Sequence, residues 1–202
     1  LQLLSASFAV LTKLCAERLC IAANAYRGSV QRTMFSAVRY GNVWGSRGSL
    51  IEIIEQQRGT GKVTLTDERM TRFLIPMENV MDFVLEVISI MRGGEIFVPK
   101  MRSFKIVDVV QTLAPECSVE TVGMRPGEKL HEMLITEYEI PRTKDAGNMY
   151  VIVPEFEWLN NDWAHSLPLF VPHGSYASNS PEFLADRDEL DAFIAPNALT
   201  DK

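Results

Sequence analysis

The sequence predicts an α/β protein in which short strands alternate with helices along most of the chain. Apolar residues recur every three or four positions in several segments, which is the spacing of a buried helix face. Between these segments lie short apolar runs that end at glycine, proline or charged residues, as buried strands do. With 202 residues and an apolar content of 47%, the chain can bury the core of one domain or of a domain and a half.

The first third of the chain is expected to alternate helix, strand and helix. The helical period predicts a helix over 5–26, which Gly28 ends near a C-cap position. Residues 34–43 are expected to form a buried strand that runs into a glycine-rich loop. Ser49 could cap a helix over 50–57, because its hydroxyl oxygen can accept a hydrogen bond from the first turn.

The middle of the chain is expected to contain a short strand at 62–66, a charged turn at 67–72 and an amphipathic helix at 76–91. Pro76 fits the first turn of this helix, where a missing N–H costs no helical hydrogen bond. One apolar stripe of the helix is expected to face the core. It consists of Met77, Val80, Met81, Val84, Val87, Ile88 and Met91.

A sharp turn is expected at 125–128, because Pro126 fixes φ and Gly127 permits unusual φ values. An amphipathic helix is expected directly after this turn. Residues 154–181 hold four prolines and little periodicity, so they are expected to form an extended tail rich in loops. The remaining elements are strands at 95–99, 119–124 and 149–153 and helices at 104–113 and 186–194.

The composition argues against several classes of protein. A net charge of −6 is unlike the basic surface of most nucleic-acid-binding proteins. The three cysteines form no C-x-x-C pair, so reduced thiols in a cytoplasmic protein are expected instead of a disulfide framework. No apolar run is long enough to cross a bilayer, and the three histidines lack the spacing of a metal site, so neither a membrane span nor a metal ion is expected.

Polar residues gather in loops that follow the expected strands, where α/β proteins bind their ligands. Asn42 offers both a donor and an acceptor, although it could equally cap its own turn. Arg69 and Arg72 could clamp a phosphate or form a solvated charged turn. Arg125 and Glu128 could bind each other, or the two ends of an anionic and hydroxylated ligand. Three arginine-bearing loops in a small acidic chain favour a diphosphate ligand.

Four linked motifs give the sequence a family resemblance: VRYGNVWGSRGS, TDERMTRFLI, GGEIFVPKMRSFKIVD and GMRPGEKLHEMLI. In this order and spacing they resemble the carboxy-terminal two-thirds of the inverting UDP-N-acetylglucosamine 4,6-dehydratases. These enzymes belong to the polysaccharide-biosynthesis group of the extended short-chain dehydrogenase/reductase superfamily. The resemblance covers roughly residues 5–195. Related 4-epimerases share the glycine-rich loop but usually lack the combination of the second and fourth motifs.

The resemblance implies an incomplete doubly wound, Rossmann-like sheet with a small α/β substrate-binding portion and a loop-rich tail. Residues 1–60 are expected to be a remnant of the dinucleotide-binding domain. Residues 61–150 are expected to form the substrate-binding portion, with 95–115 interleaving with the first part. Residues 151–202 are expected to form the extended tail with its short final helix.

The resemblance also implies a UDP-sugar as the ligand and assigns residues to it. Arg125 would bind phosphate, and Glu128 would bind the hydroxyls of the uridine ribose. Asn42 would donate to the diphosphate, and Arg72 would meet the same anion. These roles agree with the chemistry of the side chains, since a guanidinium fork suits phosphate and a carboxylate suits a diol.

The family's reaction also requires NADP, to which hydride passes from C4 of the sugar and from which it returns at C6 after water leaves. By resemblance, Lys13, Val43, Ser46 and Arg47 would contact this cofactor. Lys13 would also be the lysine of the family's catalytic Tyr-x-x-x-Lys pair, but the tyrosine position is Ala9, which cannot move a proton. The glycine-rich dinucleotide fingerprint does not occur in the sequence.

Two explanations of these differences stay open. The chain could be part of a longer enzyme, with a break near residue 11, and would then be inactive alone; this hypothesis is favoured because it explains both differences together. Alternatively, the chain could be a non-catalytic module that binds a UDP-sugar or docks a partner. A 4-epimerase is a second alternative. Under the first hypothesis one apolar face of the first helix is left exposed. A second copy of the chain in a homo-oligomer, or a missing amino-terminal half, is then expected to pack against this face.

Overall fold

The computed structural model describes residues 5–26, 33–124, 127–155, 162–172 and 174–197, and for residues 5–10 it describes the backbone alone. Two compact units are formed, and each consists of three separate stretches of the chain. The first unit contains Leu1–Tyr40, Asp82–Lys100 and Leu134–Tyr176. The second contains Gly41–Met81, Met101–Met133 and Ala177–Lys202. The domain boundaries expected from the resemblance are functional assignments and stay a prediction.

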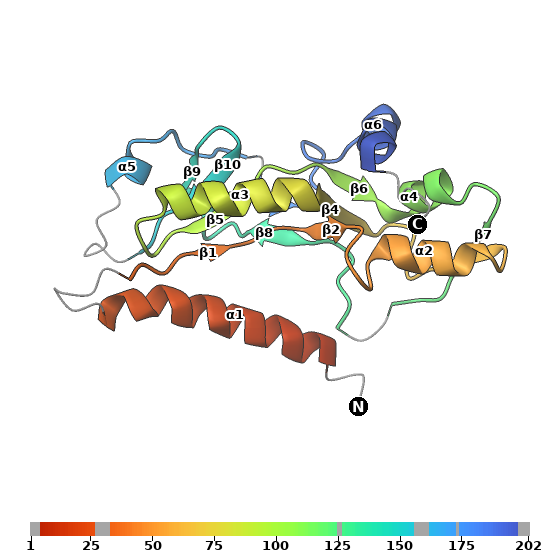
Figure 1. Ribbon diagram of the computed structural model, residues 1–202, viewed down its shortest axis with the longest axis horizontal. Helices are drawn as coiled ribbons and strands as arrows, with labels where there is room; N and C mark the ends of the chain where they lie inside the picture. Colours follow the sequence, from red (N-terminus) through yellow and green to blue (C-terminus); the bar gives the residue numbers. More distant parts are fainter. Residues whose placement is uncertain (1–4, 27–32, 125–126, 156–161, 173, 198–202) are drawn as a thin grey trace. The chain divides into compact units, whose positions relative to one another are not determined.

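The first unit is built on a mixed four-stranded sheet with the order β1-β5-β10-β9 (Figure 1). The strands are β1 (Ala37–Val38), β5 (Ile96–Pro99), β10 (Met149–Ile152) and β9 (Thr143–Asp145). β1 pairs with β5 in parallel, and β10 pairs antiparallel with both β5 and β9. The helix α1 (Ser5–Ala23) packs beside β1 and continues into the short helix η2 (Asn24–Tyr26).

The core of the first unit lies around β5 and β10, whose residues are all buried. The side chains of Phe97 and Val151 are 0% exposed, and they occupy paired positions on the two strands. Phe83 and Val87 pack against this cluster, and Trp163 stacks on Phe97 with ring centroids 6.4 Å apart. Trp163 comes from the short helix α5 (Asp162–His165), and the remaining helical turn of this unit is η3 (Ile140–Arg142).

The second unit contains a three-stranded sheet with the order β2-β4-β6 and a separate parallel pair, β3–β7. The strands are β2 (Asn42–Trp44), β4 (Thr71–Pro76), β6 (Ser103–Lys105), β3 (Lys62–Leu65) and β7 (Ser118–Thr121). Three helices contribute to the core of this unit: α2 (Leu50–Arg58), α4 (Ile106–Leu113) and α6 (Arg187–Asn197). Apolar side chains such as Ile54, Val63 and Leu190, each 1% exposed, fill this core.

The chain passes from one unit to the other at five points, and three of these lie within an element: α3 (Met77–Ile90), β8 (Met133–Ile135) and β11 (Tyr176–Ala177). β8 and β11 form a two-stranded sheet. Parallel and mixed sheets with intervening helices confirm the predicted α/β class. None of the helices that the structure describes is long and apolar enough to span a membrane.

The structure corrects five local expectations, and the first concerns residues 71–76. These residues form the buried strand β4, although residues 67–72 had been assigned to a charged turn. The apolar residues Phe73, Leu74 and Ile75 pair between β2 and β6 and bury almost completely. The expected single strand at 34–43 is likewise two short strands, because β1 and β2 join different sheets.

The helix expected after the turn at 125–128 does not form within residues 127–135. The main chain there bonds to distant segments: Leu130 accepts from the backbone N–H of Thr71 at 3.1 Å, and Glu132 donates to the Ser178 hydroxyl at 2.8 Å. These bonds use groups that a helix would need for its own i to i−4 ladder. Tertiary hydrogen bonds therefore override the amphipathic pattern.

The apolar stripe of α3 is only partly core. Val80 and Val87 are buried together with Phe83, which the expected stripe did not include. Met77, Met81 and Ile88 are 49%, 57% and 62% exposed, so the expectation that the whole stripe is buried was wrong. On α1, Leu11, Leu14 and Leu19 are also exposed in this chain.

Ser49 precedes α2 but does not cap it through its hydroxyl. Its carbonyl oxygen accepts from the N–H of Ile53, whereas its Oγ is buried and has no partner among the residues that the structure describes. The carboxylate of Glu52 in the first turn accepts from the N–H of Gly48, which precedes the cap position. Gly28, the expected C-cap of the first helix, lies outside the described residues.

Candidate functional site

The candidate ligand site lies in the second unit, at the carboxyl end of the parallel pair β3–β7. The strands run in the same direction, with Leu65 opposite Thr121, so the segments that follow them leave the same edge. Thr66 follows β3 directly, and the loop that carries Gly127 and Glu128 follows β7. Ligands of α/β proteins bind beyond the carboxyl ends of parallel strands.

Glycine permits the path of this loop. Gly123 and Gly127 have φ values of 85° and 82°, in the left-handed region that other residues rarely adopt. The expectation that Gly127 supplies an unusual φ is confirmed. Arg125 and Pro126 lie outside the described residues, so the proposed phosphate contact of Arg125 stays a prediction.

Glu128 is half-buried. Hydrogen bonds hold both its side chain and the main chain of the two residues that follow it. The Thr66 hydroxyl donates to Oε1 of Glu128 at 3.1 Å. Arg72 then donates from Nη2 to the carbonyl of Lys129 at 2.7 Å and from Nη1 to the carbonyl of Leu130 at 3.0 Å. Of the three ligand positions predicted in this unit that the structure describes, Glu128 and Arg72 are therefore brought together.

Arg72 is a largely buried cation, with a side-chain exposure of 13%. Burial lowers the pKa of Arg72, and the charges of Glu132 and Glu128 oppose this effect. Burial also raises the pKa of Glu132, which the charge of Arg72 opposes across an Nε–Oε1 distance of 3.7 Å. Because Nη1 and Nη2 donate to main-chain carbonyls, the guanidinium serves here as a clamp on the loop.

Arg69 binds within its own turn. Its Nε and Nη2 donate to the two carboxylate oxygens of Asp67 at 2.9 and 2.7 Å, and its side chain is 74% exposed. These hydrogen bonds, with one from the backbone of Arg69, lower the pKa of Asp67 to about 2. This geometry matches the solvated charged turn that was the alternative to a phosphate clamp.

A buried hydroxyl network, which sequence reasoning missed, supports the same loop. The Thr71 hydroxyl lies 2.7 Å from the Ser178 hydroxyl and 2.8 Å from Nδ1 of His131. Thr71 and Ser178 are 4% and 0% exposed. Burial lowers the pKa of His131, and the charges of Arg72 and Arg69 lower it further. The network joins positions 107 residues apart, so no local pattern could have indicated it.

The glycine-rich loop begins at Gly41, where β2 approaches β4. A Cβ at Gly41 would lie 2.4 Å from the carbonyl oxygen of Phe73 and 2.5 Å from its Cβ, so no larger residue fits. Asn42 follows, is exposed, and lies opposite Leu74 in the parallel register. Because alternate residues of a strand share a face, Arg72 and Asn42 emerge on one face of this sheet.

The predicted cofactor-binding residues of this loop are close in sequence but differ in their contacts. The Ser46 hydroxyl donates to the carbonyl of Val43 at 2.9 Å and thereby closes the turn. Val43 is half-buried within β2, and Arg47 is exposed. Lys13, the fourth predicted position, is exposed on α1 in the other unit. The side chain of Ala9 lies outside the described residues.

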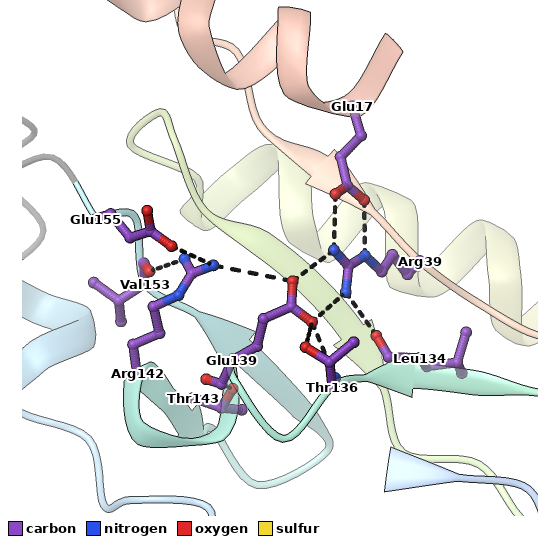
Figure 2. Close-up of polar contacts among 9 residues, drawn as sticks. All are labelled: Glu17, Arg39, Leu134, Thr136, Glu139, Arg142, Thr143, Val153 and Glu155. Atoms are coloured by element: carbon purple, nitrogen blue, oxygen red, sulfur yellow. Dashed lines mark hydrogen bonds and ion pairs between the residues drawn. The ribbon is translucent and has the colours of Figure 1, made fainter. Parts of the chain in front are cut away.

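Arg39, the first residue of the R-Y-G-N segment, is the centre of a buried ion-pair cluster in the first unit, which Figure 2 shows. Its Nε and Nη2 donate to Glu17 at 2.7 and 2.8 Å. Nη1 and Nη2 donate to the two oxygens of Glu139 at 2.9 and 2.8 Å, and Nη1 also donates to the carbonyl of Leu134 at 2.8 Å. All five N–H groups that a guanidinium possesses are therefore used.

The ion pair between Arg39 and Glu139 shifts the pKa values of both groups. Burial alone would lower the pKa of Arg39, but hydrogen bonds and charge from Glu17 and Glu139 raise it well above its usual value. Burial likewise would raise the pKa of Glu139, yet Arg39 and Thr136 lower it to about 2. Glu17 lies one helical turn after Lys13 on α1, so the cluster fixes the helix face that carries Lys13.

Among the residues that the structure describes, no three histidine, cysteine, aspartate or glutamate side chains group as metal ligands would. Cys15, Cys20 and Cys117 are free thiols. In the second unit, the carboxylate acceptor Glu128 lies near a largely buried cation, Arg72.

Comparison with known proteins gives a consistent result. The model of the family described as polysaccharide biosynthesis protein matches residues 5–154. The UDP-N-acetylglucosamine 4,6-dehydratase (inverting) of Campylobacter jejuni is 38% identical over 190 residues, which cover 89% of this chain and 57% of that protein. The UDP-glucose 4-epimerase of Rickettsia bellii is 34% identical over 155 residues, which cover 74% of this chain and 45% of that protein.

A solved structure shows the same arrangement of elements. The X-ray structure of Pen from Bacillus thuringiensis matches with a TM-score of 0.80 and 32% identity, over 94% of this chain and 57% of that chain. The chain thus spans a little over half the length of the dehydratase and of Pen.

Proposed function

The chain belongs to the polysaccharide biosynthesis protein family. We propose that it binds a UDP-sugar and is part of an enzyme that removes water from this sugar by 4,6-dehydration. The product would be used to synthesise a surface polysaccharide or glycan. The observation that carries this proposal is the match to a UDP-N-acetylglucosamine 4,6-dehydratase over 89% of the chain. In this proposal the described chain provides the binding site for the nucleotide sugar, and this site lies in the second unit.

In the proposed complex, Glu128 accepts hydrogen bonds from the two hydroxyls of the uridine ribose, and Arg125 binds phosphate. Asn42 would hydrogen-bond the diphosphate. Its exposed side chain lies on the same face of the sheet as Arg72, which supports this role. The charge of Arg72 favours the same anion. Within the part of the chain that the structure describes, Arg72 donates three hydrogen bonds, to the carbonyls of Thr71, Lys129 and Leu130, so a guanidinium with five N–H groups can contact phosphate while it keeps these bonds.

We propose a nicotinamide dinucleotide, NADP by resemblance, as the cofactor of the complete reaction. The cations of Lys13 and Arg47 suit an anionic cofactor, but the glycine fingerprint that would cradle its pyrophosphate does not occur in these 202 residues. The sequence therefore offers candidate contacts to the cofactor at Lys13, Val43, Ser46 and Arg47 but no cradle for its pyrophosphate. When bound, the cofactor would accept a hydride from the sugar and return it.

Proton transfer is the second step that these residues do not complete. A lysine next to a tyrosine lowers the tyrosine pKa, so that phenolate can remove the proton of the sugar C4 hydroxyl. Lys13 occupies the lysine position on α1, but the position one turn earlier is Ala9. We therefore propose that the isolated chain binds the nucleotide sugar without converting it.

Two other functions have an observation in their favour. The alanine at the tyrosine position, Ala9, is the observation in favour of a non-catalytic UDP-sugar-binding or partner-docking module. The 34% identity to a UDP-glucose 4-epimerase favours an epimerase, which the product alone would distinguish from a dehydratase.

Titration calorimetry with UDP and UDP-N-acetylglucosamine tests the proposal. We expect micromolar binding by the chain, a large loss of affinity in Glu128→Gln and Arg125→Ala, and no loss in Glu120→Gln. Glu120 is a suitable control because it is exposed on β7 and pairs with Lys62 at 3.9 Å, away from the loop. The absence of heat at millimolar UDP would overturn the proposal, and equal binding by the variants would overturn the assigned residues.

A further inference from the structure

Thr66 lies where the two strands that carry the site end together. Pairing of β3 with β7 continues past the last paired residues, because the N–H of Val122 donates to the carbonyl of Leu65 at 2.9 Å. The strand end next to Thr66 is therefore fixed by main-chain bonds and by the buried side chain of Leu65, which is 3% exposed. A side chain at position 66 consequently projects from a rigid part of the unit.

The Thr66 hydroxyl is directed at the carboxylate of Glu128, which lies in the loop after β7. The O–O distance of 3.1 Å makes this a hydrogen bond between residues 62 positions apart. Threonine is restricted at χ1, so its hydroxyl holds one direction more firmly than a longer polar side chain would. The carboxylate is thereby tied to a strand end, although Glu128 itself belongs to a glycine-containing loop.

The chain immediately after Glu128 is tied to a second strand. Arg72 and Thr71 of β4 together bond the carbonyls of Lys129 and Leu130 at distances of 2.7 to 3.1 Å. The side chain of Glu128 is thus held by the residue that follows β3, and the main chain after Glu128 is held by β4 of the same unit. Such a double attachment orients a carboxylate before any ligand arrives.

We propose that Thr66 is a positioning residue that holds the Glu128 carboxylate in the orientation needed to accept hydrogen bonds from two neighbouring ribose hydroxyls. This inference rests on the proposed UDP-sugar function and names the diol of the ligand as the group whose recognition depends on Thr66. A carboxylate has about four acceptor positions, so a bond from Thr66 and two bonds from a diol are compatible. Without Thr66 the carboxylate rotates more freely, and ordering it opposes binding.

The test compares Thr66→Val and Thr66→Ser with the parent chain by titration calorimetry. The probes are UDP and 2′,3′-dideoxyuridine 5′-diphosphate, which differ only in the two ribose hydroxyls. Thr64→Val is the matched control, because Thr64 lies two residues earlier, on β3, and bonds the Gln57 side chain instead. Circular dichroism establishes that each variant is folded.

Thr66→Val is expected to weaken UDP binding by about two- to tenfold, which is the usual effect of having to order one freed side chain on binding. It should leave binding of the dideoxy analogue unchanged. Thr66→Ser should restore UDP affinity, and Thr64→Val should not alter it.

If Thr66 has a merely structural role, Thr66→Val would weaken the binding of both probes equally, and that result would overturn the inference. Unchanged UDP affinity in Thr66→Val would overturn it as well, while the UDP-binding function would stand. If the parent chain does not bind UDP, the proposed function fails first, and the inference fails with it.

Discussion

Replacement of Arg39 by methionine should destabilise the first unit strongly, because it leaves two carboxylates without their cation. Methionine keeps much of the apolar stem of arginine and removes all five N–H donors. The side chains of Arg39, Glu17 and Glu139 are only 18%, 12% and 5% exposed, so water cannot readily replace the lost bonds. Removing one partner of a buried ion pair typically costs about 3–5 kcal/mol.

The pKa of Glu139 gives an independent magnitude for Arg39→Met. Its fall from 4.5 to about 2 corresponds to about 3 kcal/mol, at 1.36 kcal/mol for each pH unit. Thr136 still donates its N–H and its hydroxyl to Glu139 in the variant, at 3.0 and 2.9 Å, and keeps part of this stabilisation. We therefore expect a loss of about 3 kcal/mol in the free energy of unfolding at pH 7, at the lower end of the range for buried pairs.

The pH dependence gives a sharper test than the loss at a single pH. A carboxyl group whose pKa is lower in the folded state stabilises the fold above its unfolded pKa, and this contribution disappears as the pH falls through the folded pKa. The wild-type chain should therefore lose the contribution of Glu139 between about pH 5 and about pH 2. Arg39→Met lacks most of this contribution, so the difference between the two proteins should shrink toward pH 2.

Urea denaturation at pH 7, 5 and 3, with hydrogen exchange resolved to α1 and to residues 134–143, measures both effects. The matched control is Arg58→Met, because the ion pair of Arg58 with Glu116 is about half exposed and should contribute little. The reasoning fails if Arg39→Met is as stable as this control at pH 7. A loss that stays constant from pH 7 to pH 3 would also refute it, because the pKa of Glu139 would then not depend on Arg39.

Three further predictions concern other parts of the chain. Gly41→Ala should destabilise the second unit by about 2 kcal/mol, because the added methyl group overlaps Phe73, and an unchanged urea midpoint would contradict this. Trp44→Phe should cost about 1 kcal/mol in thermal denaturation, because it removes the indole N–H bond to the carbonyl of Asn197 at 2.8 Å; an unchanged melting temperature would show that this bond contributes nothing. Ala9→Tyr in the isolated chain should produce no 4-keto sugar from UDP-N-acetylglucosamine with added NADP, since a restored tyrosine supplies neither the pyrophosphate cradle nor the rest of the site. Turnover by either form of the isolated chain would refute that proposal.

The sequence by itself determined the elements whose signals are local. The period of apolar residues located α1, α2 and α3, and short apolar runs located β5 and β10, because each pattern reflects neighbours within one or two turns or along one strand. The need for glycine at Gly127 was also visible, since the Pro-Gly pair predicts the sharp turn that the positive φ confirms. The motifs around Asn42 and Glu128 indicated the family, which the match over residues 5–154 confirmed.

Only the tertiary structure decided how the polar side chains are used. Arg72 was expected to meet a phosphate, yet its Nη donors bind the carbonyls of residues 57 and 58 positions away. No local pattern indicates the role of Arg39, because its partners Glu17 and Glu139 lie 22 and 100 positions from it. The helix expected after Gly127 does not form, because the main chain there also bonds to distant segments. Polar groups that become buried must form hydrogen bonds, and their partners often come from distant segments of the chain. A local sequence pattern cannot show which distant residue that partner will be.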